Sequence, residues 1–159
     1  MLIKETAFLR AFGFLKIPML FFISPTVQRL DREVCIVKVP LNFRTKNHLG
    51  SMYFGVLSAG ADIAGGLIAM KMIHEGGNKI SLVFKDFNAK FFKRAEGHVF
   101  FTCTQGLDIQ NLVQKALDGD ERVEMPVDIV ATVPSKTGDE PVAQFTLTLS
   151  LKKKKAKAD

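Results

Sequence analysis

The sequence predicts an α+β fold in which a five-stranded antiparallel sheet wraps around one long central helix. Residues 51–74 form a helix-length segment that is apolar on nearly every side, and such a helix must be surrounded by other structure. Other segments alternate apolar and polar residues, which is typical of strands with one face on a core and one in solvent. Together these patterns favour a sheet that curves over the helix.

Length and composition indicate a single folded domain. The chain has 159 residues, of which 47% are hydrophobic and 24% charged, so it can form a full core and does not have the composition of a disordered chain. We expect one domain over residues 1–151, in which residues 1–25 add an N-terminal helix. Residues 152–159 form a basic C-terminal tail.

The net charge of +6 does not indicate nucleic acid binding. Five lysines and one aspartate give residues 152–159 a charge of +4, so only about +2 belongs to the rest of the chain. Aromatic residues are not interleaved with the basic ones, as a single-strand binder would need. Cys35 and Cys103 lie in strand-like segments without a Cys/His cluster nearby, so we expect no metal site and two buried thiols in a reducing compartment, the cytoplasm.

The N-terminal helix is apolar, but Arg10, Lys16 and Pro18 interrupt it. The uncharged part is too short for a membrane span, and no cleavage site follows, so neither a secretory signal nor stable membrane insertion is expected. Packing on the domain is the favoured interpretation. A lid-like or interfacial element over a lipophilic site remains the alternative.

The other elements follow in order along the chain. Residues 32–41 form a strand, the central helix ends at paired glycines near residues 74–78, and a long strand over 79–95 turns at 96–97 into a hairpin with residues 98–104. The remaining segments are a short helix over 108–117, a strand over 122–133, a turn over 135–141 and a strand over 144–151. Pro126 indicates an edge or a bulge, because it has no N–H to donate.

The central helix contains glycines that weaken it. Each costs roughly 0.5–1 kcal/mol relative to alanine, so close packing against the sheet is the simplest explanation for Gly60, Gly65 and Gly66. Gly55 differs because it lies in the first turn. There, free N–H groups and the helix dipole can stabilise an oxyanion.

Asp62 lies in the middle of the same helix. An ionised carboxylate in apolar surroundings is costly unless it is paired or functional. Lys71 is too distant along the helix to pair with it directly, although a salt bridge to another element remains open. We favour a functional role, because a carboxylate with a raised pKa can act as a general base or a nucleophile.

The order of elements and the segment "NHLGSMYFGVLSAGAD" resemble the hotdog-fold thioesterase superfamily, especially its phenylacetate-pathway-type and small uncharacterised branches. Asn47 matches that pattern's asparagine, and Asp62 matches its helix-borne acid. Tyr53, Phe54 and Gly55 occupy the place of its His-Gly-Gly, so only the glycine agrees. The resemblance covers roughly residues 30–152.

This resemblance implies an acyl-CoA thioesterase with coenzyme A as part of the substrate and no separate cofactor. It also implies a homodimer or dimer of dimers with the acyl site at the interface. The implied catalytic residues are Asp62, Asn47 and Gly55. The candidate substrate-binding residues are His48, Ser51, Tyr53, Phe54, Arg44 and Lys46, with N-terminal capping as the structural alternative for Ser51.

A non-catalytic module that binds an acyl-CoA or fatty-acyl chain is the alternative function. The large side chains of Tyr53 and Phe54, which replace the small residues usual in the superfamily, favour it. His74 and His98 fall at predicted element ends and are interpreted as ordinary surface residues.

Overall fold

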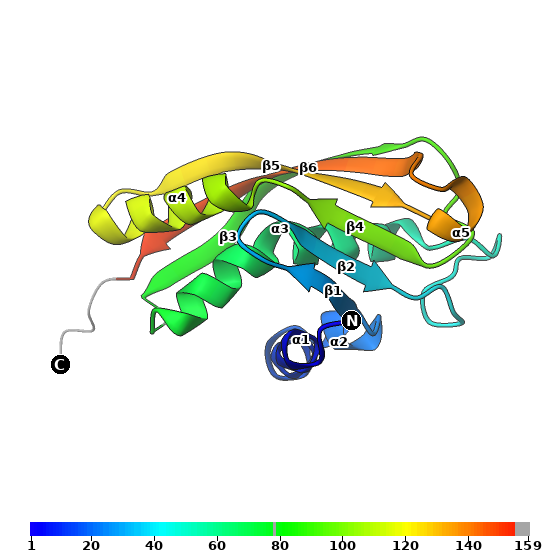
Figure 1. Cartoon of the computed structure of the whole chain (residues 1–159), viewed down its shortest axis with the longest axis horizontal. Coiled ribbons are helices and arrows are strands. Elements are labelled where there is room, and N and C mark those ends of the chain that lie inside the picture. The colour runs from blue at the N-terminus through cyan, green and yellow to red at the C-terminus, as the bar shows by residue number, and fades with distance from the viewer. Residues whose placement is uncertain (78, 155–159) are drawn as a thin grey trace.

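The structure, a computed structural model, describes residues 1–77 and 79–154 and places a curved sheet over a long helix (Figure 1). The helices are α1 (Ile3–Lys16), α2 (Pro18–Phe22), α3 (Phe54–Glu75), α4 (Gly106–Asp118) and α5 (Pro134–Thr137). The strands are β1 (Thr26–Leu30), β2 (Cys35–Val39), β3 (Ile80–Phe91), β4 (Val99–Cys103), β5 (Val123–Thr132) and β6 (Pro141–Lys153).

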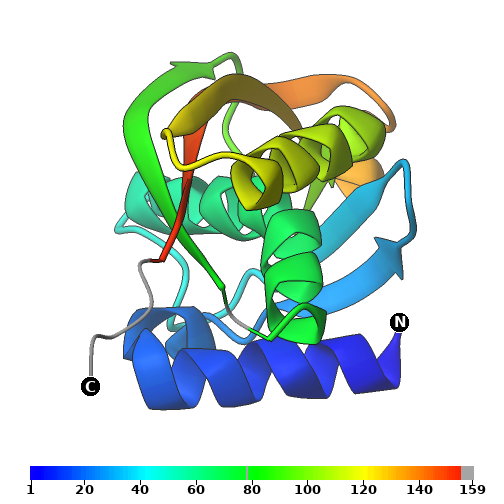
Figure 2. The same ribbon diagram turned by 90° about the vertical axis from the view of Figure 1, so that its left-hand side faces the viewer.

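The described strands form one six-stranded sheet in the order β1-β2-β4-β5-β6-β3, in which every neighbouring pair is antiparallel. The sheet curves around α3, and α1 runs beneath them (Figure 2). The predicted antiparallel sheet around a central helix is therefore confirmed. The predicted count of five strands is too low by one.

The strand that the sequence analysis missed is β1, with the sequence TVQRL. Its alternation is too short and too polar to indicate a strand by itself. It forms because β2 pairs with one edge of β1, and residues at the start of the chain form hydrogen bonds with the other edge. Val27 N–H donates to the Thr6 hydroxyl at 3.0 Å, and Leu2 N–H donates to the Val27 carbonyl at 2.7 Å. Long-range contacts thus define this strand.

The predicted hairpin around residues 96–97 is wrong. β3 pairs with β6, whereas β4 pairs with β2 and β5. β5 and β6 therefore lie between β3 and β4 in the sheet. The connecting segment instead bonds to other parts of the chain, since Phe92 N–H donates to the Val142 carbonyl and Met52 N–H donates to the Ala95 carbonyl. A Gly-containing turn between two apolar runs predicts a hairpin only where no better partner competes for the strands.

Helix α3 begins at Phe54, a little later than predicted, and ends at Glu75. Tyr53 is the N-cap residue and makes no side-chain capping bond, so the capping role considered for Ser51 is wrong. Gly77 lies just after the helix with φ +79°, a conformation that favours glycine. The paired glycines therefore end the helix as predicted.

Helix α3 is long and apolar enough to cross a membrane, yet 72% of its most apolar window is buried inside the protein. It is thus a core helix. Two of its glycines do allow close packing, because an added Cβ would lie 2.3 Å from the Phe101 ring at Gly60 and 3.1 Å from Ile129 at Gly65. At Gly66 the nearest atom would be 3.5 Å away, an ordinary contact, so the packing explanation does not extend to this glycine.

The N-terminal region forms two helices and not the single helix that was predicted. Pro18 starts α2 at its first turn, where a missing N–H costs nothing. The two helices pack tightly, since a Cβ at Gly13 would lie 2.8 Å from the Phe21 backbone nitrogen. Leu9, Leu20 and Ile23 join the core, which confirms that this region packs on the domain.

The C-terminal half matches its predicted pattern closely. Alternate residues of β5 and β6 face the core, and the buried ones include Val127, Ile129, Ala131, Phe145, Leu147, Leu149 and Leu151. Pro126 lies on the part of β5 that is not paired with β4, as predicted for an edge. Residues 134–137, which overlap the predicted turn over 135–141, form α5. β6 continues through Lys153, two residues into the predicted tail, and residues 155–159 lie outside the described residues.

The two cysteines, distant in sequence, are direct partners across β2 and β4, and both are buried free thiols. Burial raises the pKa of the Cys35 thiol, and the neighbouring Cys103 adds to that effect. Both residues therefore contribute to packing.

The spacing between α3 and the sheet gives a stability prediction. Gly60→Ala should lower the free energy of unfolding by about 1–3 kcal/mol, because the new methyl group collides with the fully buried Phe101 ring. Gly66→Ala is the matched control: its methyl fits, and its better helix propensity should add roughly 0.5–1 kcal/mol. Urea denaturation of both variants measures the difference. A Gly60 variant as stable as the Gly66 variant would contradict the packing.

Candidate functional site

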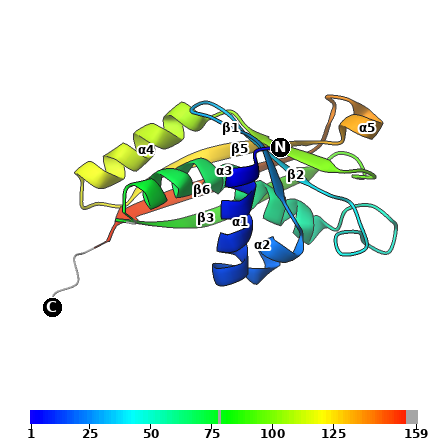
Figure 3. The same ribbon diagram turned by 60° about the horizontal axis from the view of Figure 1, so that its bottom comes forward.

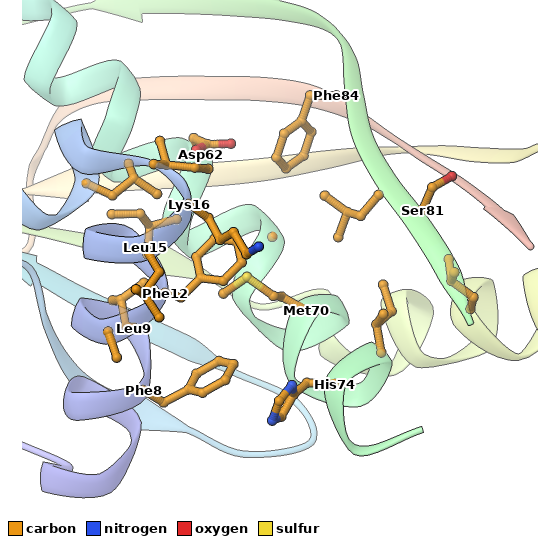
Figure 4. A pocket seen from close by; sticks show the side chains of 18 of the residues that line it. Phe8, Leu9, Phe12, Leu15, Lys16, Asp62, Met70, His74, Ser81 and Phe84 are labelled. Carbon is orange, nitrogen blue, oxygen red and sulfur yellow. The ribbon is translucent and has the colours of Figure 1, made fainter. Parts of the chain in front are cut away.

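A cavity of about 860 Å³ lies between α1, α3 and β3 (Figure 4). Apolar side chains form most of its wall: Phe8, Leu9, Phe12, Leu15, Leu20, Ile63, Met70, Ile73, Ile80, Leu82 and Phe84. Its size lies within the roughly 300–1,000 Å³ of typical small-molecule sites. An apolar chain is the ligand that such a wall favours.

Asp62 is the acidic residue on this wall, and it lies at one end of the cavity (Figure 4). The side chain is mostly buried, and among the described residues it has neither a hydrogen bond nor an ion-pair partner. Burial raises the pKa of the Asp62 carboxyl, because the charged form loses hydration. The group is thus a better proton acceptor than an exposed aspartate.

The other polar lining residues come from the ends of α1 and α3, from β3 and from the residue after β6. His74 is twelve residues further along α3, roughly 18 Å along the helix axis, and its ring packs at 5.1 Å from that of Phe8. Lys16, Ser81 and Lys154 also line the cavity. The cavity therefore has a carboxylate at one end and basic side chains elsewhere on its wall.

The loop before α3 is held by Asn47. Its side-chain oxygen accepts from Leu49 N–H at 2.9 Å and Ser51 N–H at 3.2 Å, and its side-chain nitrogen donates to the Ser51 hydroxyl at 3.1 Å. Ser51 is buried, and Gly50 adopts φ +82° in the same turn. Asn47 and Ser51 therefore fix the loop that leads into the helix.

The start of α3 carries two backbone N–H groups, those of Phe54 and Gly55, that have no backbone acceptor in the described chain. Both point along the helix dipole, as an anion site requires. The Tyr53 ring packs directly on Gly55, because an added Cβ there would lie 2.6 Å from the ring. Tyr53 and Phe54 are exposed, and their ring centroids are 4.9 Å apart.

The two chemical parts of the site are not brought together within one chain. Gly55 and Asp62 are seven residues apart on one helix, so roughly 10 Å separates them along its axis. A thioester carbonyl cannot contact both groups at once over that distance. Within a single chain, the carboxylate of Asp62 and the candidate oxyanion donors at the start of α3 are therefore two separate parts of the site.

The basic candidates lie on the loop between β2 and α3. Arg44 stacks on two aromatic rings, those of Phe22 at 5.6 Å and Phe43 at 5.3 Å, while Lys46 and His48 are exposed. His98 Nδ1 accepts from Leu41 N–H at 3.0 Å and so has a structural role.

The sequence analysis missed most of the cavity wall. His74 is an exposed residue at the end of α3, as predicted, and it also lines the cavity. Phe8 and Phe12, four residues apart on α1, and the alternation of Ile80, Leu82 and Phe84 were visible patterns. They indicate apolar faces, but only the fold shows that these faces meet around a hollow.

The comparisons with known proteins agree with this architecture. The chain matches the family described as "Domain of unknown function (DUF4442)" over residues 5–151. No curated protein matches the chain. A protein of unknown function from Chlorobaculum tepidum has a similar structure, with 15% identity, a TM-score of 0.79 and 94% of each chain covered.

Two further solved structures carry thioesterase names. A protein of unknown function from Pseudomonas aeruginosa, called a probable thioesterase, is 20% identical with a TM-score of 0.75, over 94% of this chain and 96% of that one. A thioesterase from Haemophilus influenzae is 15% identical with a TM-score of 0.67, over 89% of this chain and 87% of that one. This chain shares the fold of these structures, the hotdog fold that the sequence resemblance implied. The chain belongs to the DUF4442 family.

The raised pKa of Asp62 gives a pH-dependent prediction. The folded state binds the proton more tightly than the unfolded state, so ionisation of Asp62 lowers stability as the pH rises above the ordinary aspartate pKa of about 3.9. Asp62→Asn should therefore melt at a higher temperature than the native protein at pH 7. That advantage should disappear below about pH 4.

Thermal melts from acidic to neutral pH measure the effect. Asp139→Asn, which removes an exposed carboxylate from a turn, is the control for the loss of one negative charge. A lower melting temperature of Asp62→Asn at pH 7 would mean that Asp62 has a stabilising partner.

Proposed function

We propose that the protein is an acyl-CoA thioesterase in which Asp62 is the catalytic carboxylate. The observation that carries the proposal is the position of Asp62, unpaired among the described residues, at one end of a large apolar cavity. The thioesterase names of two proteins with the same fold support the substrate class. The cavity would hold the acyl chain and leave the thioester carbonyl beside the carboxylate.

In the proposed reaction, Asp62 accepts a proton from a water molecule as the water oxygen attacks the thioester carbonyl. The tetrahedral oxyanion then collapses, the C–S bond breaks, and the thiolate takes up the proton as free coenzyme A. Attack by the carboxylate itself would give a mixed anhydride that water then cleaves to the same products. Both routes need one carboxylate and an oxyanion site.

A second copy of the chain would supply the oxyanion donors. Phe54 and Gly55 lie too far along α3 from Asp62 to serve the same chain, so the start of α3 in one subunit would face Asp62 in the other. The edge strand β3 offers the surface for such pairing. Phe87 and Phe91 are register partners of the buried residues Leu147 and Ala143 on β6, so they lie on the core-facing side of the sheet. Both are nevertheless exposed, because β3 is an edge strand.

The loop before α3 would contact coenzyme A. Arg44 and Lys46 can bind its phosphates, while His48 and the Asn47–Ser51 turn position the thioester end. Coenzyme A is part of the substrate here and not a cofactor. A cytoplasmic location belongs to this proposal, because two buried free thiols suit a reducing compartment.

The second candidate function is a non-catalytic acyl-CoA or fatty-acyl binding module. It is favoured by one observation, the Tyr53 ring packed beside Gly55, which places a large side chain next to the amides that an oxyanion hole would use. Saturable binding of acyl-CoAs without any turnover would support this module and exclude the enzyme.

The chemical role of Asp62 can be tested by hydrolysis of short, long and aromatic acyl-CoAs. Asp62→Asn keeps the size of the side chain but removes its basicity, so turnover should fall by about 10²–10⁴-fold. Acyl-CoA binding, measured in parallel, should change little. Asp86→Asn on β3 is a control carboxylate outside the cavity wall. Undiminished turnover in Asp62→Asn would exclude Asp62 as base or nucleophile.

The proposed pairing predicts a homodimer. Light scattering should give about twice the 17.6 kDa mass of one chain, or four times if two dimers associate. Phe87→Asp/Phe91→Asp should shift the mass to that of a monomer, because charges on the exposed apolar edge oppose burial. Leu107→Asp, at an exposed position on α4, is the control, and circular dichroism checks the folding of each variant. A native protein that is monomeric at micromolar concentration would contradict the pairing.

A further inference from the structure

The helices α1 and α2, their connection and the loop after β2 carry seven large exposed apolar side chains, which we call the elbow surface. It consists of Phe14, Leu15, Ile17, Met19, Phe21, Phe22 and Phe43. Each of these residues is at least 40% exposed, and Phe43 reaches 77%. Isolated exposed apolar residues are ordinary, but seven on one helix pair and the adjoining loop indicate an interaction surface.

The elbow surface is a built feature. Gly13 lets the two helices approach closely, Pro18 begins α2, and the Phe14 and Phe21 rings meet edge to face at 5.4 Å. Arg44 links α2 to the loop before α3 by stacking on Phe22 and Phe43. Leu20 is the buried residue of α2, so it is the side chain that packs this helix against the core. The Phe14–Phe21 contact and the Arg44 stack therefore hold these rings in place while they stay exposed.

The chain segments that carry the elbow surface contain basic residues and no acidic ones, and the nearest acidic residue on the adjoining cavity wall is Asp62. Residues 6–30 and 40–61, which contain it, include no aspartate or glutamate, although the chain has 16 acidic residues. Lys16 lies within the elbow and Arg44 stacks at its margin, and both are exposed. Arg29, inside the first segment, is paired with Asp31, which lies just after that segment. A partner that is apolar inside and negatively charged on its surface would match this arrangement.

We propose that the elbow surface docks the protein reversibly onto an anionic phospholipid bilayer. The α1–α2 connection projects from the body of the protein on the side away from the sheet (Figure 3). Its exposed side chains can therefore meet a broad flat partner. Phe, Leu and Met side chains can enter the outer roughly 5–10 Å of a bilayer while basic residues remain at the headgroups. Each basic residue near an anionic surface strengthens binding by roughly fivefold.

A second copy of the chain is a weaker match for the elbow. Pairing of two such surfaces would place like charges, Lys16 and Arg44 of each copy, around one apolar contact. The edge strand β3 is a separate apolar surface that suits a second copy better. The bilayer therefore accounts for both the exposed aromatic residues and the missing acidic ones.

The elbow also adjoins the cavity. Leu15 and Ile17 belong to both the elbow surface and the cavity wall, and Lys16 between them lines the cavity as well. Docking would place the cavity wall beside the acyl region of the bilayer. The docking does not depend on thioester hydrolysis, since neither Asp62 nor the start of α3 belongs to the elbow surface.

The test is co-sedimentation of the whole protein with phosphatidylcholine vesicles that contain about a third phosphatidylglycerol. The native protein should bind these vesicles and release from them in 1 M salt, where the screening length falls to about 3 Å. Phe14→Ser/Met19→Ser should bind at least about tenfold more weakly, because two side chains that would enter the bilayer become polar. Arg44→Glu should weaken binding as well and flatten the salt dependence.

Leu107→Ser is the control, because it removes an apolar side chain that is also more than half exposed from α4, away from the elbow. It should bind vesicles as the native protein does. Absence of binding to the anionic vesicles overturns the proposal, as does equal loss of binding in Leu107→Ser. A native dimer that Phe14→Ser/Met19→Ser converts to a monomer, without vesicle binding, would assign the elbow to a second copy. Circular dichroism of each variant keeps these outcomes separate from misfolding.

Discussion

Removal of the apolar helix α3 from water is the constraint on which the rest of the structure depends. A helix that is apolar on nearly all sides cannot lie on a surface, so the sheet must curve around it and every inward strand position must be apolar. Gly60 sets the spacing, because it admits the Phe101 ring against the helix backbone. The same enclosure surrounds Asp62, whose mostly buried carboxyl lines the cavity.

Patterns local to one element predicted the parts of the fold that burial determines. The apolar run of α3 and the alternation of β5 and β6 follow directly from which side chains are buried. Both were identified from the sequence. β1 could not be identified this way, because Val27 becomes part of a strand through bonds to Leu2 and Thr6, more than twenty residues earlier. The wrong hairpin has the same origin. Strand partners are a property of the whole sheet, and residues 96–97 carry no information about β6.

The candidate site was predictable in part for the same reason. Asp62 stood out because a carboxylate in an apolar helix is costly, and that cost is visible in one segment. The cavity could not be predicted, because its wall combines residues of α1, α3 and β3. No pattern within one segment indicates that the segments enclose an empty space. Asn47 was identified by resemblance, yet its observed bonds hold the turn before the helix. The fold fixes where a carboxylate and a helix start lie, while the residues around them decide the chemistry.

The two edges of the sheet are unequal, and this difference limits how copies of the chain can associate. The outer edge of β1 already bonds to the chain's own N-terminus through Val27, whereas β3 has a partner on one side only. Extension of the sheet by strand addition can therefore proceed at one end alone. Two copies that join through β3 leave no further open edge between them, so growth stops at that step. A sheet with two open edges could instead add copies indefinitely, and the short N-terminal contact removes that route to fibrous aggregates.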